Sequence, residues 1–92
     1  MAVNNERDSG IEIDLKTKAL QLVDRHLRKM AGYRKQFNYN FLNNMHERID
    51  HELGFCEEIG LLSEEEVKNK QDIVVKIMES PTYTPEGDGD YF

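Results

Sequence analysis

The spacing of apolar residues predicts a long helix in the first half of the chain. From about Glu12 onward, apolar side chains recur every three or four residues and so share one face of a helix: Leu20, Val23, Leu27 and Met30. Gly32 can end this helix at its C-terminus, although a helix can also continue through glycine at a cost of about 1 kcal/mol. Residues 1–11 hold few apolar side chains, so we expect a flexible lead-in there.

A second helical pattern runs from Phe37 to Ile59, with charged residues concentrated at its polar positions. Gly54 lies inside this pattern and leaves two alternatives open, a continuous helix or a break at that residue. The apolar positions of the pattern are Phe37, Phe41 or Leu42, Met45, Ile49, Leu53, Cys56 and Ile59.

The start of a third helix has the clearest local signal in the sequence. Gly60 can close the preceding helix, and Ser63 with Glu66 three residues later forms a capping box. Leu62 and Val67 flank this cap as a hydrophobic staple. The third helix is therefore predicted from Glu64 to about Glu79, where Pro81 prevents its continuation. Its apolar residues available for burial are Val67, Ile73, Val74, Ile77 and Met78.

These patterns predict an all-α fold, a small helical bundle made of a long helical hairpin and a short third helix. We expect the bundle to span residues 12–79 and an acidic tail to span residues 80–92. A core of this size seldom supplies more than about 3–5 kcal/mol of stability. A monomeric three-helix bundle and a hairpin that dimerises both fit the pattern, and we favour a homo-oligomer, most simply a dimer.

Length and composition restrict the classes of protein to consider. The chain has 92 residues, which is enough for one small domain. Cys56 is the single cysteine, which excludes an internal disulfide and a cysteine-based zinc site. No apolar run approaches the roughly 18 residues of a membrane span, and the first residues lack the features of a secretory signal. We therefore expect a cytoplasmic protein with no membrane contact.

Charge is distributed unevenly along the chain. Residues 14–35 hold seven basic and two acidic side chains, whereas residues 36–92 hold four basic and thirteen acidic ones. The basic block with its aromatic neighbours, within residues 25–41, suits an anionic ligand such as a nucleic acid or nucleotide. The candidate residues are Arg25, Arg28, Lys29, Tyr33, Arg34, Lys35 and Tyr39. The alternative is that Phe37 and Phe41 form a core pair and that the cations pair with the acidic second helix.

No catalytic or metal-binding motif stands out. His46 and His51 are five residues apart, which does not match the spacing of a helical zinc-protease motif. The pairs His46 with Asp50 and Glu47 with His51 each share a helix face, as solvated polar pairs usually do. Cys56 falls on an apolar face, where a thiol is inert. We expect no enzyme activity, no cofactor and no metal.

The end of the chain combines acids, glycines and a pair of terminal aromatic residues. We expect Asp88, Asp90, Tyr91 and Phe92 to contact a partner, because aromatic side chains anchor while acids steer towards a basic surface. Over eight residues this end resembles the acidic tip of bacterial and phage single-stranded DNA-binding proteins, although no oligonucleotide-binding barrel precedes it. In those proteins the tip docks into basic-rimmed pockets on other proteins. The alternatives are a solubilising tail and a tail that folds back over the basic block.

Taken together, these features favour a small, non-enzymatic protein–protein interaction module. Such a protein would act as an adaptor, regulator or inhibitor of a larger protein through its acidic surfaces and its C-terminal aromatic tip. Binding of nucleic acid or a nucleotide through residues 25–41 is the alternative.

Overall fold

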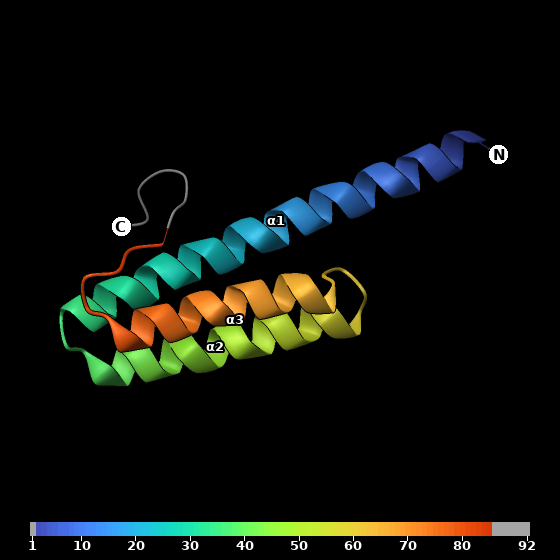
Figure 1. Ribbon diagram of the computed structural model, residues 1–92. Helices are drawn as coiled ribbons and strands as arrows, with labels where there is room; N and C mark the ends of the chain where they lie inside the picture. The colour runs from blue at the N-terminus through green and yellow to red at the C-terminus, as the bar shows by residue number, and fades with distance from the viewer. Residues whose placement is uncertain (1, 86–92) are drawn as a thin grey trace.

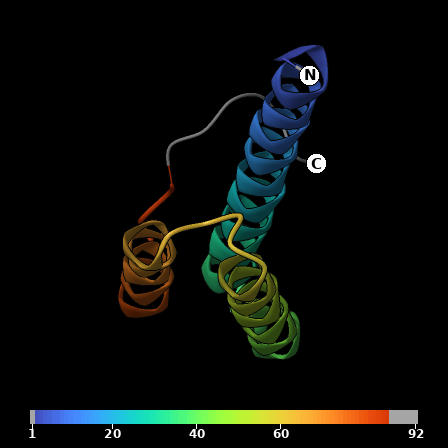
Figure 2. The same cartoon turned by 90° about the vertical axis from the view of Figure 1, so that its right-hand side faces the viewer.

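The computed structural model describes the backbone of residues 2–85 and the side chains of residues 14–85. Within these residues the chain forms three helices and no strand: α1 (Ala2–Lys35), α2 (Tyr39–Glu58) and α3 (Glu64–Glu79). α1 and α2 form a long antiparallel hairpin, and the shorter α3 packs beside it (Figure 1). The end-on view shows α2 and α3 as two separate columns, both next to α1 (Figure 2). The predicted all-α bundle is confirmed.

α1 is longer than the apolar pattern predicted. It begins at Ala2 rather than near Glu12, and it continues through Gly32 to Lys35. Each residue added to an existing helix gains one hydrogen bond, so polar residues can extend α1 without an apolar face. At 1.5 Å per residue its 34 residues reach about 51 Å, against about 30 Å for the 20 residues of α2. The N-terminal turns therefore project beyond the other helices (Figure 1). None of the three described helices is apolar enough over sufficient length to cross a membrane.

The core lies where the three helices meet. It contains most of the predicted apolar positions of the three helices, and Cys56 is buried as expected. Ion pairs surround it and tie the helices together. They join Lys16 to Glu66 at 2.9 Å and Lys70 to Asp24 at 2.7 Å, and a hydrogen bond joins His26 to Glu52 at 2.8 Å. The buried apolar residues are Val23, Leu27, Met30, Ala31, Leu42, Ile49, Leu53, Cys56, Leu62, Val67, Val74 and Ile77.

The interpretation of Phe37 and Phe41 as a core pair is wrong. Their side chains are 62% and 54% exposed. Phe37 lies in the turn before α2, so the two residues are not one turn apart on the same helix. Phe41 instead contacts Tyr33 of α1, with ring centroids 5.4 Å apart in an edge-on arrangement. Ile59, at the C-terminal cap of α2, is also exposed.

α1 and α2 end in the same hydrogen-bond pattern, a Schellman motif. In each case a residue with a left-handed backbone follows the helix. At α1 this residue is Phe37, with φ 56°, whose N–H donates to the carbonyl of Arg34. At α2 it is Gly60, with φ 78°, whose N–H donates to the carbonyl of Glu57. Gly60 thus ends α2 as predicted, and α2 passes through Gly54 without a break.

The predicted capping box at the start of α3 is confirmed. The Ser63 hydroxyl accepts from the N–H of Glu66 at 3.1 Å, and the Glu66 carboxylate accepts from the N–H of Ser63 at 3.0 Å. Leu62 and Val67, the two residues of the predicted staple, are both buried. α3 ends at Glu79, two residues before Pro81, as the sequence indicates.

The first six residues of the expected tail, 80–85, run back beside α1 (Figure 1). Lys35 Nζ donates to the hydroxyl of Thr84, Tyr83 packs against the core, and Pro85 is buried. This segment therefore belongs to the packed bundle, and it covers part of the basic end of α1.

Candidate functional site

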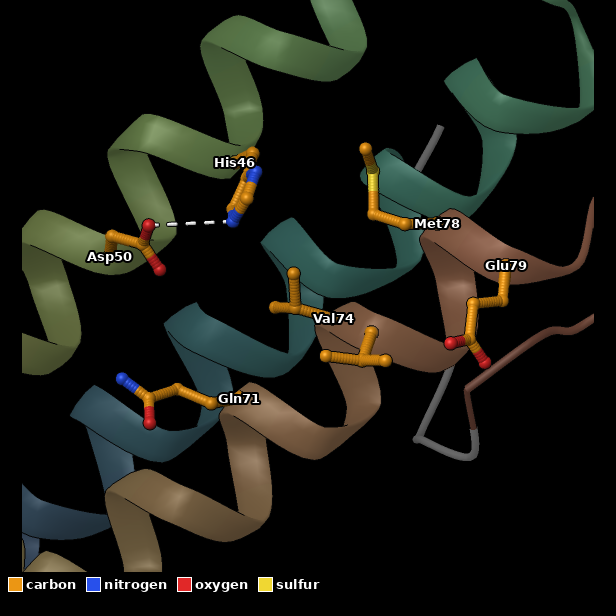
Figure 3. Close-up of a pocket in the computed structure, with 7 residues that line it drawn as sticks. His46, Asp50, Gln71, Val74, Met78 and Glu79 are labelled. Atoms are coloured by element: carbon orange, nitrogen blue, oxygen red, sulfur yellow. Dashed lines mark ion pairs between the residues drawn. The ribbon is translucent and has the colours of Figure 1, made fainter.

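An apolar groove of about 430 Å³ runs between α2 and α3. Figure 3 shows side chains of both helices around this space. Val74 and Met78 come from α3, and His46 and Asp50 stand on the α2 wall. His46 Nε2 lies 3.4 Å from the Asp50 carboxylate. We call this site the α2–α3 groove, lined by His46, Asp50, Gln71, Val74, Val75, Met78 and Glu79.

The sequence of α3 explains why the groove is apolar. Val74 and Ile77 point into the core, and this orientation fixes the direction of the neighbouring positions. Gln71, Val75 and Met78 are spaced by four and three residues, so they share one edge of the helix. Val75 is 50% exposed, although it lies beside buried Val74. α3 thus carries a wider apolar face than its contacts with the hairpin cover.

The surroundings of the groove are acidic. Asp50 and Glu79 are exposed at its margin. Over residues 39–79, which include both helices, the chain has ten acidic and four basic side chains. An apolar floor with an acidic margin suits a ligand that combines apolar side chains with basic ones.

The structure does not bring the seven residues predicted to bind an anion together on one surface. Arg28 is only 7% exposed. Arg34 Nε donates to the carbonyl of Met78 at 3.2 Å, and Lys35 is bonded to Thr84. Arg28 is therefore buried in the bundle, Arg34 joins the end of α1 to the end of α3, and Lys35 joins α1 to the segment that follows α3.

Two of the predicted residues, Lys29 and Tyr33, line a second hollow of about 290 Å³ on the α1–α2 side. Arg48 joins them from α2, so two cations border one hollow together with two aromatic rings. Arg25 and Tyr39 are exposed outside it. We call this hollow the basic-aromatic depression, lined by Lys29, Tyr33, Phe41, Asn44, Met45 and Arg48.

Comparison with known proteins adds no further assignment. No family model, curated protein or solved structure matches the chain. The function must therefore be inferred from the two hollows and their side chains.

Besides the His46–Asp50 pair of the α2–α3 groove, the groups with chemical potential are candidate metal ligands and the Cys56 thiol. Within residues 14–85, no three His, Cys, Asp or Glu side chains are grouped in a way that could hold a metal ion. Burial, together with the nearby Glu52 carboxylate, raises the pKa of the Cys56 thiol. This thiol is therefore a poor nucleophile, since reactivity requires the thiolate.

Arg48 and the open face of α3 are the features that the sequence analysis missed. Residues at similar distances from the turn face each other in an antiparallel hairpin. This relation places Arg48 within one helical turn of the position opposite Lys29, once the turn at residues 36–38 is known. Val75 could have been found as an apolar residue beside the predicted core stripe of α3. The expected contact residues Asp88, Asp90, Tyr91 and Phe92 lie outside the described residues.

Proposed function

We propose that the protein is a non-enzymatic interaction module that holds a basic amphipathic helix of a larger protein in the α2–α3 groove. The observation that carries this proposal is the partly exposed apolar edge of α3, where Val75 and Met78 face a groove between two helices. Binding of an amphipathic helix in an apolar groove is a common mode of recognition. An adaptor, regulator or inhibitor could work in this way.

The acidic margin decides the chemistry of the proposed partner. Asp50 and Glu79 would attract lysine or arginine side chains that flank the apolar face of the bound helix. His46 beside Asp50 adds a polar contact at the wall of the groove. A helix with acidic flanks would be repelled, so charge contributes to the choice of partner.

A labelled model peptide tests the proposal. The peptide is an amphipathic helix of leucine and lysine, and its binding is measured by fluorescence anisotropy at two salt concentrations. The variant Val75→Asn/Met78→Gln should weaken binding by roughly tenfold, because two apolar contacts are lost. Tyr39→Gln, an exposed position at the start of α2 that does not line the groove, is the control and should leave binding unchanged.

The charge and tail variants complete the experiment. Asp50→Asn/Glu79→Gln should weaken binding and reduce its salt dependence. Deleting residues 87–92, which include Asp88, Asp90, Tyr91 and Phe92, tests whether the tail tip makes a second contact with the peptide. Weaker peptide binding after the deletion would indicate that it does. Equal binding by the wild type and the groove variant would overturn the assignment of the α2–α3 groove.

We also propose that two copies of the chain associate through the outer face of the hairpin. Leu15 and Leu22, one heptad apart on α1, are exposed, as are Phe55 of α2 and Ile59 at the C-terminal cap of α2. All four lie in the half of the hairpin away from its turn. A bundle with few core residues gains stability when such positions are buried against a second copy. A dimer of this kind leaves the α2–α3 groove free for the partner.

We also propose that the protein acts in the cytoplasm, because Cys56 is a free thiol and the cytoplasm keeps thiols reduced.

A further inference from the structure

We propose that the basic-aromatic depression binds a nucleoside phosphate, with the phosphate between Lys29 and Arg48 and the base against the aromatic rings. This site is separate from the α2–α3 groove and does not depend on the function proposed there.

The pairing of the basic residues points to an anion. Most cations on α1 already have a partner: Lys16 pairs with Glu66, and Lys18 with Asp14. Lys29 and Arg48 form no hydrogen bond or ion pair with any described residue. They come from different helices and border the same hollow. An anion placed between them would relieve their mutual repulsion and accept hydrogen bonds from both side chains.

The rest of the lining suits a nucleobase. Tyr33 and Phe41 meet edge-on, and the Phe41 ring is 54% exposed. Stacking of a base on an aromatic ring is favourable for every base, because each has a π face. The Asn44 amide can both donate and accept hydrogen bonds at a base edge. A volume of about 290 Å³ is close to the lower limit of small-molecule sites, which suits a single nucleotide.

The charge of the whole chain favours a free nucleotide over a long nucleic acid. The formal net charge is −6, and the acidic residues are concentrated in α2, α3 and the segment that follows. A long polyanion that crossed the depression would approach this acidic surface and be repelled. A single nucleotide would contact Lys29 and Arg48 without reaching the acidic surface, so it would not be repelled.

Calorimetric titration of the full-length protein with adenosine monophosphate tests the proposal, with inorganic phosphate and adenosine titrated separately. The nucleotide should bind saturably and more tightly than either of its parts. Lys29→Gln/Arg48→Gln should weaken nucleotide binding by about tenfold or more, because both phosphate contacts are lost. Lys68→Gln/Lys76→Gln removes two exposed positive charges on α3, away from the depression, and should change the affinity by less than about twofold.

A further variant separates the base from the phosphate. Phe41→Ala should weaken binding of adenosine monophosphate while leaving binding of inorganic phosphate unchanged. Phe41 is exposed and outside the core, so this variant should remain folded, which circular dichroism checks.

Three results would overturn the proposal: no saturable binding of the nucleotide at millimolar concentrations, equal losses in the site variant and the charge control, or equally tight binding of phosphate and nucleotide. An oligothymidylate serves as a competitor. Displacement of the nucleotide by the oligomer would identify a nucleic-acid strand as the source of the nucleoside phosphate, whereas no displacement would identify the free nucleotide.

Discussion

Gly60 ends α2 with a φ of 78°, a conformation in which an L side chain crowds its own backbone. A Cβ at this position would meet no atom within 4 Å, so Gly60→Ala adds no clash with the rest of the bundle. The left-handed backbone costs a non-glycine residue about 1–2 kcal/mol. Alanine also reduces the freedom of the unfolded chain, which offsets about 0.4–1 kcal/mol. The variant should therefore lose about 1 kcal/mol of stability.

Phe37 provides the reverse experiment at the end of α1. It occupies the same position of the same motif, with φ 56°, and its ring is largely exposed. Phe37→Gly should therefore gain up to about 1 kcal/mol, since it removes the left-handed cost. Phe37→Ala keeps that cost while removing the ring, so comparison of the two variants separates backbone strain from side-chain contacts.

Thermal unfolding followed by far-ultraviolet circular dichroism measures these differences. In a domain of this size, 1 kcal/mol corresponds to a shift of about 4–8 °C in Tm. The reasoning fails if Gly60→Ala is as stable as the wild type, or if Phe37→Gly is less stable than Phe37→Ala. Either result would mean that the left-handed backbone of these two residues does not determine the stability differences between the variants.

Three further predictions concern acid stability, thiol reactivity and assembly. Hydrogen bonds from the Ser63 amide and Lys16 lower the pKa of the Glu66 carboxyl, so its stabilising effect is present above the unfolded pKa and is lost as the pH falls through the folded one. Unfolding of Glu66→Gln should accordingly depend less on pH than wild-type unfolding below about pH 4.5, with Glu65→Gln as control. Cys56 should react with a disulfide reagent far more slowly in the native protein than in denaturant, and rapid native reaction would contradict its burial. Leu22→Lys/Phe55→Lys should shift the sedimentation of the protein from dimer to monomer, and a wild type that is already monomeric at high concentration would exclude the proposed dimer.

Local chemistry explains which parts of the fold the sequence could predict. The start of α3 depends on groups within a few residues of one another, namely the Ser63 hydroxyl and the Glu66 carboxylate, and it forms as predicted. The end of α2 at Gly60 is local in the same sense. The core stripe of α1 also follows directly from its spacing. Such signals require no knowledge of what packs against the helix.

The errors arose where a second element decides the outcome. The end of α1 depends on Phe37 adopting a left-handed backbone, which its residue type disfavours. Because of this turn, Phe37 and Phe41 are exposed and do not form the predicted core pair. The basic block was also split by tertiary contacts, since Arg34 bonds to the end of α3 and Lys35 to Thr84. The extension of α1 to Ala2 carries no apolar signal in the sequence, because helix extension needs no apolar pattern.

The arrangement of α2 allows the two proposals to be tested independently. His46 faces the α2–α3 groove and Arg48 faces the basic-aromatic depression, and two residues along a helix correspond to about 200° of rotation. α2 is thus a wall of both hollows, with their ligands on opposite sides. Arg48→Gln should leave peptide binding intact, and Met78→Gln should leave nucleotide binding intact. Loss of both activities in either variant would point to a change in α2 itself, because no shared contact connects the two ligands.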